Sequence, residues 1–403
     1  MAFLTGPTNA VKDAIKEATE MLPVDEDGFK AAVETILKPW LSKNVTSGKF
    51  TSFDGARIQY FRALNPNAKG VIVMVHGFCE FFGKFHEPAY NFWESGYSIY
   101  FIEQRGHGGS QRSVHALDHV DVSDFSKYVE DLKAFLDKVV IPETQGLFSR
   151  AATSANAATG KASVAGAATG KASAPSAGTA SAGAATSGIM SSRGTSKLPL
   201  FLYAHSMGGC VSALFLERHP EYFRSAVLSS PMLKMTFGSI PLWQVKMLMV
   251  TSRTLRWNEQ TMPGQNDFDP AKPDFEGSAS LSKARYDYQW DLRVDPASRG
   301  LNTMNAGTYR WGRAAWKATQ ELLKDEAKVK IPVLICQAGN DVFVDNEGQD
   351  HFAKTAKRTK LIRYPEAKHE IYASGGEIQK KYFEDVLGFY ASVLRDGREK
   401  SGN

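Results

Sequence analysis

The sequence has little of what marks secreted, disulfide-bonded or membrane-spanning chains. It holds only three cysteines in 403 residues, too few for the disulfide framework of a small secreted domain. No apolar run approaches the roughly 18 residues that a membrane-spanning helix needs, and the longest one, at 240–250, is interrupted by Lys246. The N-terminus lacks the basic and apolar regions of a secretory signal. We therefore expect a protein of a reducing, cytoplasmic compartment.

Acidic residues are missing from one stretch, 146–199, which holds five basic ones. The net charge of +5 therefore lies in this stretch, and the rest of the chain is neutral on balance. That balance gives no electrostatic reason to expect a nucleic-acid partner. Large side chains are scarce there as well, since 33 of the 40 residues at 151–190 are Ala, Gly, Ser or Thr. We predict a disordered insertion at 146–196, because such a segment cannot offset its own ordering entropy.

Short apolar runs alternate with helical patterns in the rest of the chain. The helical patterns lie at 122–139 and 207–219. The runs that predict buried parallel strands are 71–75, 98–102, 200–204, 226–228, 332–336 and 361–364, and 57–63 predicts an edge strand. This alternation predicts an α/β fold with a mostly parallel central sheet flanked by helices.

About a hundred residues between the runs at 226 and 332 have no strand pattern, yet they hold five of the seven tryptophans. This block is too long for one crossover helix, so we predict a helical cap at 231–330, inserted after the sixth strand. The predicted α/β core is then 46–230 and 331–403. Residues 1–45 are predicted to form an N-terminal helical extension.

The segment YAHSMGGC, residues 203–210, joins a predicted strand to a predicted helix. The pattern G-x-S-x-G at such a junction is a nucleophile elbow, which exposes a serine on a sharp turn at a helix N-terminus. Here Ser206 is the serine and Gly208 follows it, whereas Ala204 takes the place of the first glycine. The alternative interpretation is that Ser206 merely caps an ordinary helix.

A nucleophilic serine needs a base and an acid that orients this base, in the chain order Ser, Asp, His. Asp341 follows the run at 332–336, and Asp345 is a second candidate for the acid. His369 follows the run at 361–364 and is the candidate base. Each residue alone is unremarkable, but their order and their places at strand ends favour a catalytic triad.

An oxyanion hole needs two backbone amides near the serine. One is expected from Met207, directly after Ser206, and the other from Phe78, in the loop that follows the run at 71–75. We expect His76 to shape that loop, and His205 to point away from the active site and pack in the core.

The sequence contains no cofactor or metal motif. The glycines at 106–109 and 166–170 lack the spacing of dinucleotide and phosphate loops. His107, His115 and His119 match no standard set of metal ligands, and we expect Arg105 and His107 to brace the surrounding loops. We therefore predict neither a metal nor a cofactor.

The segments HGF, RGHGGS, AHSMGG, GNDVFVD and KHE together resemble the monoglyceride-lipase and lysophospholipase branch of the α/β-hydrolases, and lysophospholipase L2 in particular. The resemblance covers about residues 50–395. It implies an α/β-hydrolase fold with Ser206 as nucleophile, Asp341 as acid and His369 as base, and with Phe78 and Met207 as oxyanion donors.

The resemblance also implies a function, which we state as an expectation. A serine hydrolase of this branch would cleave a carboxylic ester of a single-chain lipid, a lysophospholipid or a monoacylglycerol, through an acyl-enzyme. The alternatives are a general carboxylesterase, a serine aminopeptidase and a non-catalytic binding module. Arg285 and Arg310 are expected either to meet a lipid phosphate or to be solvated. The segment 237–250 predicts either peripheral membrane contact or a buried cap helix, and the oligomeric state stays open.

Overall fold

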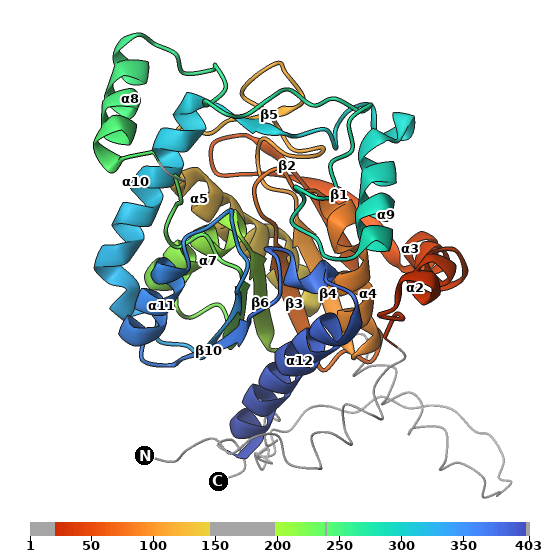
Figure 1. Cartoon of the computed structure of the whole chain (residues 1–403). Coiled ribbons are helices and arrows are strands. Elements are labelled where there is room, and N and C mark those ends of the chain that lie inside the picture. The colour runs from red at the N-terminus through yellow and green to blue at the C-terminus, as the bar shows by residue number, and fades with distance from the viewer. Residues whose placement is uncertain (1–20, 146–197, 238–239, 400–403) are drawn as a thin grey trace, which may run out of the picture.

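The computed structural model describes residues 21–237, except 146–197, and residues 240–399 (Figure 1). The predicted insertion at 146–196 and the first part of the predicted N-terminal extension lie outside these residues. The described part of that extension forms two short helices, α2 (Glu26–Ala32) and α3 (Lys38–Asn44).

An eight-stranded sheet crosses the middle of the molecule, in the order β1-β2-β4-β3-β6-β7-β9-β10. β1 and β2 pair antiparallel, as do β2 and β4, and every other pair is parallel. The strands are β1 (Val45–Thr51), β2 (Arg57–Ala63), β3 (Gly70–Val75), β4 (Tyr97–Ile102), β6 (Leu200–His205), β7 (Ser225–Ser229), β9 (Val333–Ala338) and β10 (Thr359–Tyr364). The predicted mostly parallel sheet is confirmed.

Within this sheet, the one strand that the sequence analysis did not predict is β1. Its sequence, VTSGKFT, buries only Phe50. An edge strand with so little apolar surface has no alternating pattern strong enough to be read from the sequence alone. It forms because β2 offers it a full antiparallel partner.

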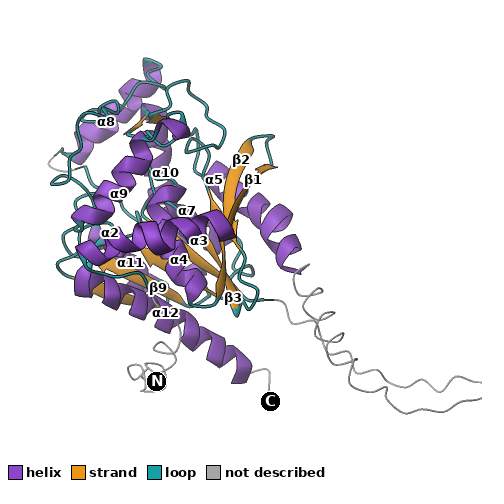
Figure 2. Cartoon of the chain, turned by 90° about the vertical axis from the view of Figure 1, so that its right-hand side faces the viewer, coloured by secondary structure: helices purple, strands orange, loops and turns teal. Residues whose placement is uncertain are grey.

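Helices cover both faces of the sheet (Figure 2). The alternation of side chains along β3 shows this arrangement, because Val71, Val73 and Val75 belong to one apolar cluster and Ile72 and Met74 to another. The first cluster includes side chains of α5 (Ser126–Phe135) and α7 (Met207–Arg218), and the second includes those of α4 (His86–Glu94) and α12 (Gly376–Glu399). α11 (Asn346–Thr355) packs beside β10. The helix predicted at 122–139 begins four residues later than expected, at residue 126, and it continues as a π-helical segment at 136–140.

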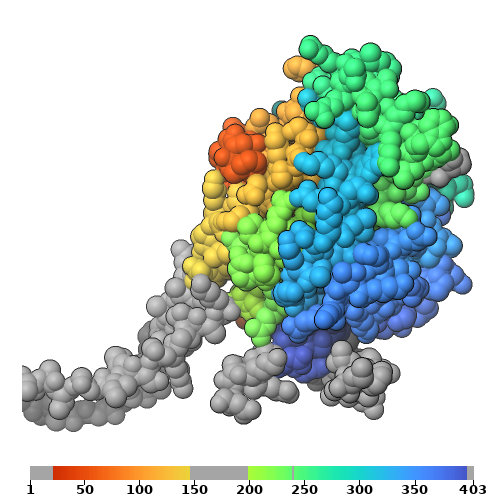
Figure 3. Space-filling model, turned by 90° about the vertical axis from the view of Figure 1, so that its left-hand side faces the viewer, coloured from red at the N-terminus to blue at the C-terminus, as the bar shows by residue number. Residues whose placement is uncertain are grey.

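Three helices lie between β7 and β9, where the cap was predicted: α8 (Leu242–Thr254), α9 (Lys283–Val294) and α10 (Tyr309–Asp325). A short strand of this region, β8 (Ala306–Gly307), pairs with β5 (His119–Val120) of the core. α10 begins two residues after β8 and packs against α7. Figure 3 shows the two helices side by side on one face. α8 lies at an outer corner of the molecule, beside α10 (Figure 1).

Candidate active site

A sharp turn between β6 and α7 holds Ser206. Its backbone has φ 52° and ψ −121°, a region that a non-glycine residue occupies only where the surrounding structure enforces it. Two hydrogen bonds enforce it here: the Ser206 amide donates to the carbonyl of Ser229 (3.0 Å), and the Met232 amide donates to the carbonyl of Ser206 (2.9 Å). The turn is thus fixed by the adjacent strand β7.

Close packing around this turn requires the glycines that follow Ser206. A Cβ atom on Gly208 would lie 2.4 Å from the carbonyl oxygen of Val75, and one on Gly209 would lie 2.4 Å from Cβ of Pro231. Ala204, in place of the usual first glycine, is fully buried with its methyl group accommodated. The sequence therefore folds as an elbow in spite of that substitution.

The structure brings Ser206, His369 and Asp341 together from three strand ends. The Oγ of Ser206 lies 2.8 Å from Nε2 of His369, and Nδ1 of His369 lies 2.7 Å from Oδ2 of Asp341. The other oxygen of Asp341 accepts hydrogen bonds from the amides of Phe343 (2.9 Å) and Val344 (3.2 Å), which fix the carboxylate. A carboxylate facing Nδ1 places the proton there, so that Nε2 is free to accept the serine proton.

The second candidate for the acid, Asp345, does not face His369. Its side chain caps α11 by accepting a hydrogen bond from the Glu347 amide (2.9 Å), and it forms an ion pair with Lys234 (2.7 Å). Of the two carboxylates left open by the sequence, the geometry favours Asp341.

Two backbone amides beside Ser206 are free to act as donors. Within the described part of the chain, the amides of Phe78 and Met207 donate to no protein group, whereas the flanking amides of Gly77 and Cys79 do. The helix N-terminus that begins at Met207 adds its partial positive charge. This pair of amides is what an oxyanion hole needs.

The loops around the oxyanion donors are braced by buried histidines, as expected. His76 Nε2 accepts a hydrogen bond from the Gln104 amide (2.9 Å), and His107 Nε2 accepts one from the Cys79 amide (3.2 Å). Arg105 braces the neighbouring loop through ion pairs with Asp131 and Asp54.

Aromatic side chains lie beside His369 and at the loop that holds the Phe78 amide. The ring of Phe343 lies 5.2 Å from that of His369. Phe343 is about half exposed (47%), and its neighbour Val342 is largely exposed (75%). The ring of Phe78 packs against Trp311 of α10, 4.2 Å away. These groups give the site an apolar rim.

Both expectations for Arg285, that it meets a lipid phosphate or is solvated, are wrong. This side chain is fully buried and forms an ion pair with Glu87 (2.8 Å), because α9 lies against α2 and α4 at that point. Arg310 is partly exposed and forms an ion pair with Asp121 (2.5 Å).

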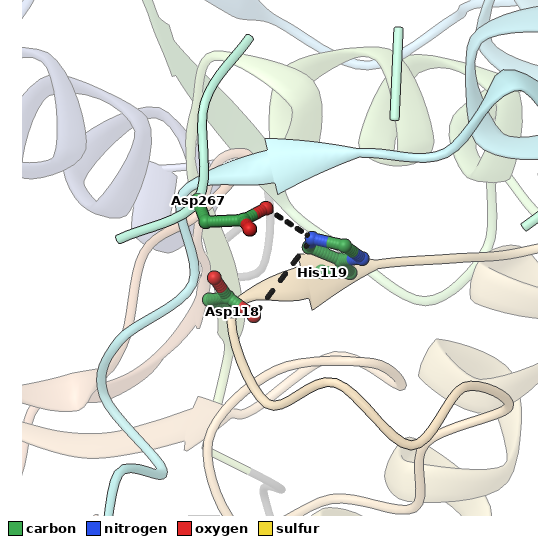
Figure 4. A group of neighbouring side chains, drawn as sticks. All are labelled: Asp118, His119 and Asp267. Carbon is green, nitrogen blue, oxygen red and sulfur yellow. Dashed lines mark hydrogen bonds and ion pairs between the residues drawn. The ribbon is translucent and has the colours of Figure 1, made fainter. Parts of the chain in front are cut away.

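His119 lies in a small polar group with Asp118 and Asp267 (Figure 4). Its Nε2 is 2.9 Å from Asp267 and 3.8 Å from Asp118, and Asp118 also accepts a hydrogen bond from the amide of Phe268 (3.0 Å). Asp267 and Phe268 belong to the cap region, whereas the other two residues belong to the core. These contacts therefore fasten the cap to the core, beside the β5–β8 pair.

Two residues behind the triad were missed as parts of the site. Glu80 was not singled out, and His205 was expected only to pack in the core. His205 is indeed buried, but its Nδ1 lies 3.0 Å from Glu80 and its Nε2 lies 3.3 Å from the carbonyl oxygen of His369. Only the position of Glu80, three residues after Gly77 in the oxyanion loop, could have suggested this contact.

The profile of the family described as Hydrolase_4, serine aminopeptidase S33, matches residues 66–155 and 182–374. The chain belongs to this S33 family. Curated relatives are a probable lysophospholipase L2 of Haemophilus influenzae, 22% identical over 83% of this chain and 88% of its own, and a monoacylglycerol lipase of Mycolicibacterium smegmatis, 23% identical over 88% and 100%. The lysophospholipase L2 of Escherichia coli is 24% identical over 76% and 74%.

Solved structures share the fold of this S33 chain. A soluble variant of the monoglyceride lipase of Saccharomyces cerevisiae has a TM-score of 0.59 at 17% identity, covering 87% of this chain and 96% of its own. A carboxyl esterase of Bacillus coagulans has a TM-score of 0.56 at 15% identity, covering 87% and 99%. The predicted α/β-hydrolase fold and the resemblance to the lysophospholipase and monoglyceride-lipase branch are confirmed.

Proposed function

We propose that the protein is a serine hydrolase that cleaves a carboxylic ester of a single-chain lipid through an acyl-enzyme. The observation that carries this proposal is the continuous hydrogen-bonded line from Asp341 through His369 to Ser206 on a strained elbow. A helix-capping serine needs neither that strain nor a histidine at 2.8 Å.

The mechanism follows from the placement of these groups. His369 removes the proton of Ser206 as its oxygen attacks the acyl carbonyl, and Asp341 stabilises the imidazolium that forms. The amides of Phe78 and Met207 hold the oxyanion of the tetrahedral intermediate. His369 then protonates the departing alcohol and activates water to hydrolyse the acyl-enzyme.

The substrate class rests on the relatives and on the apolar rim. The curated relatives are named as lysophospholipases and monoacylglycerol lipases, and exposed apolar side chains such as Phe343 lie beside the base. An acyl chain would bury this surface. We favour a lysophospholipid, with a monoacylglycerol or a simple carboxylic ester as the alternative, and an aminoacyl amide is disfavoured.

Two measurements test the proposal. A fluorophosphonate probe should label the wild-type protein on Ser206 and fail to label Ser206→Ala, because the probe reacts only with an activated serine. Turnover should then be compared for lysophosphatidylcholine, monoacylglycerol, short p-nitrophenyl esters and aminoacyl amides. Fast turnover of the amides alone would overturn the lipid assignment.

We also propose that α8 brings the enzyme to a membrane surface. Among the described residues, no helix is both long and apolar enough to cross a bilayer, so the contact would be peripheral. Leu242, Trp243, Met247 and Val250 of α8 are 53%, 63%, 58% and 66% exposed. These residues occupy neighbouring i, i+4 rows and so share one outward face.

Charge supports a lipid partner for this face. Lys246 lies within it, and Arg253 follows in the last turn of α8. An apolar face with a tryptophan and flanking cations is typical of a helix lying in the interface of an anionic membrane. Such a contact would place the enzyme where single-chain lipids are concentrated.

A further inference from the structure

A buried charged cluster lies directly behind the base. Glu80 is only 3% exposed, and its two oxygens accept hydrogen bonds from the amide of Gly77 and from the hydroxyl of Tyr372 (3.2 Å). Nδ1 of His205 lies 3.0 Å from the same carboxyl group. Glu80 therefore faces donors on every side, as an ionised carboxylate requires.

Both ring nitrogens of His205 face acceptors. Nδ1 faces the Glu80 carboxylate, and Nε2 lies 3.3 Å from the main-chain carbonyl oxygen of His369. A neutral imidazole has one donor and one acceptor nitrogen, so it could satisfy only one of these contacts. The other nitrogen would then present a lone pair to an oxygen atom inside the protein, which is costly.

This inference rests on the proposed function. We infer that His205 is a buried imidazolium, paired with Glu80, which positions the catalytic base by donating a hydrogen bond to the main-chain carbonyl of His369. His205 does not touch the reacting atoms, so it is a positioning residue.

The charges around His205 support its protonated form. Burial disfavours the charge of the imidazolium, but the charge of Glu80 and the hydrogen bond to it outweigh burial and raise the pKa of His205. Burial likewise disfavours the Glu80 carboxylate, yet His205 and Lys84 lower the pKa of Glu80. Lys84 in turn forms an ion pair with Glu370. The cluster thus holds two anions and two cations.

Two further titratable neighbours of His205, His76 and Tyr372, add no positive charge beside it. Burial lowers the pKa of His76 to about 4, so this ring is neutral in the neutral range. The rings of Phe85 and Tyr372 pack against His205, and that of His369 lies 4.8 Å away. Burial raises the pKa of Tyr372 far above its usual range, so the phenol stays neutral.

One carboxylate therefore connects the two halves of the catalytic machinery. Glu80 holds the amide of Gly77, next to the oxyanion donor Phe78, and through His205 it holds the backbone of His369. The distance between base and oxyanion hole would thus be set by a single buried ion pair. Because the pKa of His205 is raised, this connection persists to higher pH than an ordinary imidazole would allow, and it is lost as the pH rises through that pKa.

The test measures how fast a fluorophosphonate labels Ser206 between pH 5 and 10, in wild type and in Glu80→Gln. Wild type should lose reactivity on the alkaline side as His205 loses its proton. Without the carboxylate, burial makes His205 neutral at lower pH, so the alkaline limb of Glu80→Gln should move down by more than one pH unit. With a good ester substrate, kcat at pH 7 should fall about 10- to 100-fold with KM little changed, as expected for the loss of a charged hydrogen bond.

Glu103→Gln is the matched control, because Glu103 is equally buried (3%) but binds the amides of Gly109 and Phe82, away from His205. Its pH profile should keep the wild-type shape. An unchanged profile in Glu80→Gln would overturn the inference and leave the proposed function standing, whereas absence of labelling in wild type would overturn the proposed function itself.

A direct measurement covers the case in which Glu80→Gln fails to fold. In wild-type protein labelled with ¹⁵N-histidine, both ring nitrogens of His205 should show the NMR shifts of an imidazolium at pH 7, with the signal assigned by its loss in His205→Gln. The shifts of a neutral ring at that pH would overturn the inference.

Discussion

Helices α7 and α8 are both apolar and of nearly equal length, but their environments are opposite. Ten of the twelve residues of α7 are buried, whereas only Val245 and Ser252 are buried among the thirteen residues of α8. α7 lies between the sheet and α10, and α8 stands at the corner of the molecule (Figure 1). Apolar composition alone therefore indicates that a helix needs an apolar partner, but not that the partner lies within the same chain.

The difference also separates two roles. α7 begins directly after Ser206 and is held so tightly that Gly208 and Gly209 admit no side chain. Such rigidity suits the proposed role of its N-terminus beside the nucleophile. α8 contributes no residue to the triad or the oxyanion hole. We therefore expect changes in α7 to alter turnover and stability, and changes in α8 to alter membrane binding.

The largest effect is expected where α7 begins. Ser206→Ala should lower esterase activity by roughly 10⁴-fold or more, because no other group can form the acyl-enzyme. Ser212→Ala, within the same buried helix and without a hydrogen-bond partner for its hydroxyl among the described residues, is the control and should leave turnover unchanged. Comparable turnover by Ser206→Ala and wild type would exclude the proposed nucleophile.

A leucine-to-alanine substitution should lower the free energy of unfolding far more in α7 than in α8. Leu214→Ala in α7, where the side chain is 1% exposed, should lower the free energy of unfolding by about 2–5 kcal/mol, because a cavity remains. Leu242→Ala in α8, where the side chain is 53% exposed, should change it by less than about 0.5 kcal/mol. Urea unfolding of both variants checks this, and equal losses would mean that the face of α8 with Leu242 is also covered in solution.

The sequence was sufficient to predict the parts of the fold that depend on local pattern. Runs such as 71–75 and 200–204 are buried on both faces of the sheet, so composition alone identified them as strands. The burial of Arg285 depends on Glu87, 198 residues away in the chain, which no local pattern contains. β1 pairs with the next strand along the chain, β2, but with Phe50 as its one buried residue it has no apolar pattern to identify it.

In the candidate site, too, some residues could be predicted from local sequence and others could not. Ser206, Asp341 and His369 follow strand ends, where spacing is informative, and the structure brings all three together. The contact between Glu80 and His205 joins a loop to the end of β6, 125 residues apart, and it could be found only in three dimensions. The orientation of α8 was left open by the sequence, because a buried helix has the same composition.

The outward face of α8 should decide how strongly the protein binds lipid vesicles. Trp243→Glu combined with Met247→Glu should lower binding to anionic phosphatidylcholine–phosphatidylserine vesicles about 10-fold or more, because two apolar contacts are lost and two negative charges are added. Co-sedimentation measures this.

Leu255→Glu is the matched control for that experiment. Leu255 is also 53% exposed, but it follows α8 and lies off the face formed by Leu242, Trp243, Met247 and Val250. It should retain most of the binding, and turnover of a water-soluble ester should be unchanged in all variants. Equal losses in both variants would show that general charge, and not this face, governs binding.

The smallest expected effect is on the free energy of unfolding, and it comes from a carboxyl group that is partly buried near the end of α7. Glu217, near the end of this helix, has an oxygen that is buried without a partner among the described residues, and burial raises the pKa of its carboxyl to about 8, with Asp325 and Glu326 adding to the effect. The folded state therefore holds a proton that the unfolded chain releases near pH 4–5, so this group should make the protein less stable as the pH rises from about 5 to 8.

Glu217→Gln removes the titration and should be more stable than wild type by about 1 kcal/mol at pH 9, with almost no difference at pH 5. Urea midpoints at both pH values measure this. For Glu321→Gln, on the exposed side of the neighbouring α10, the stability difference from wild type should not increase between pH 5 and pH 9. A constant difference between pH 5 and pH 9 would mean that Glu217 reaches water, and that α7 is less completely enclosed than its contrast with α8 implies.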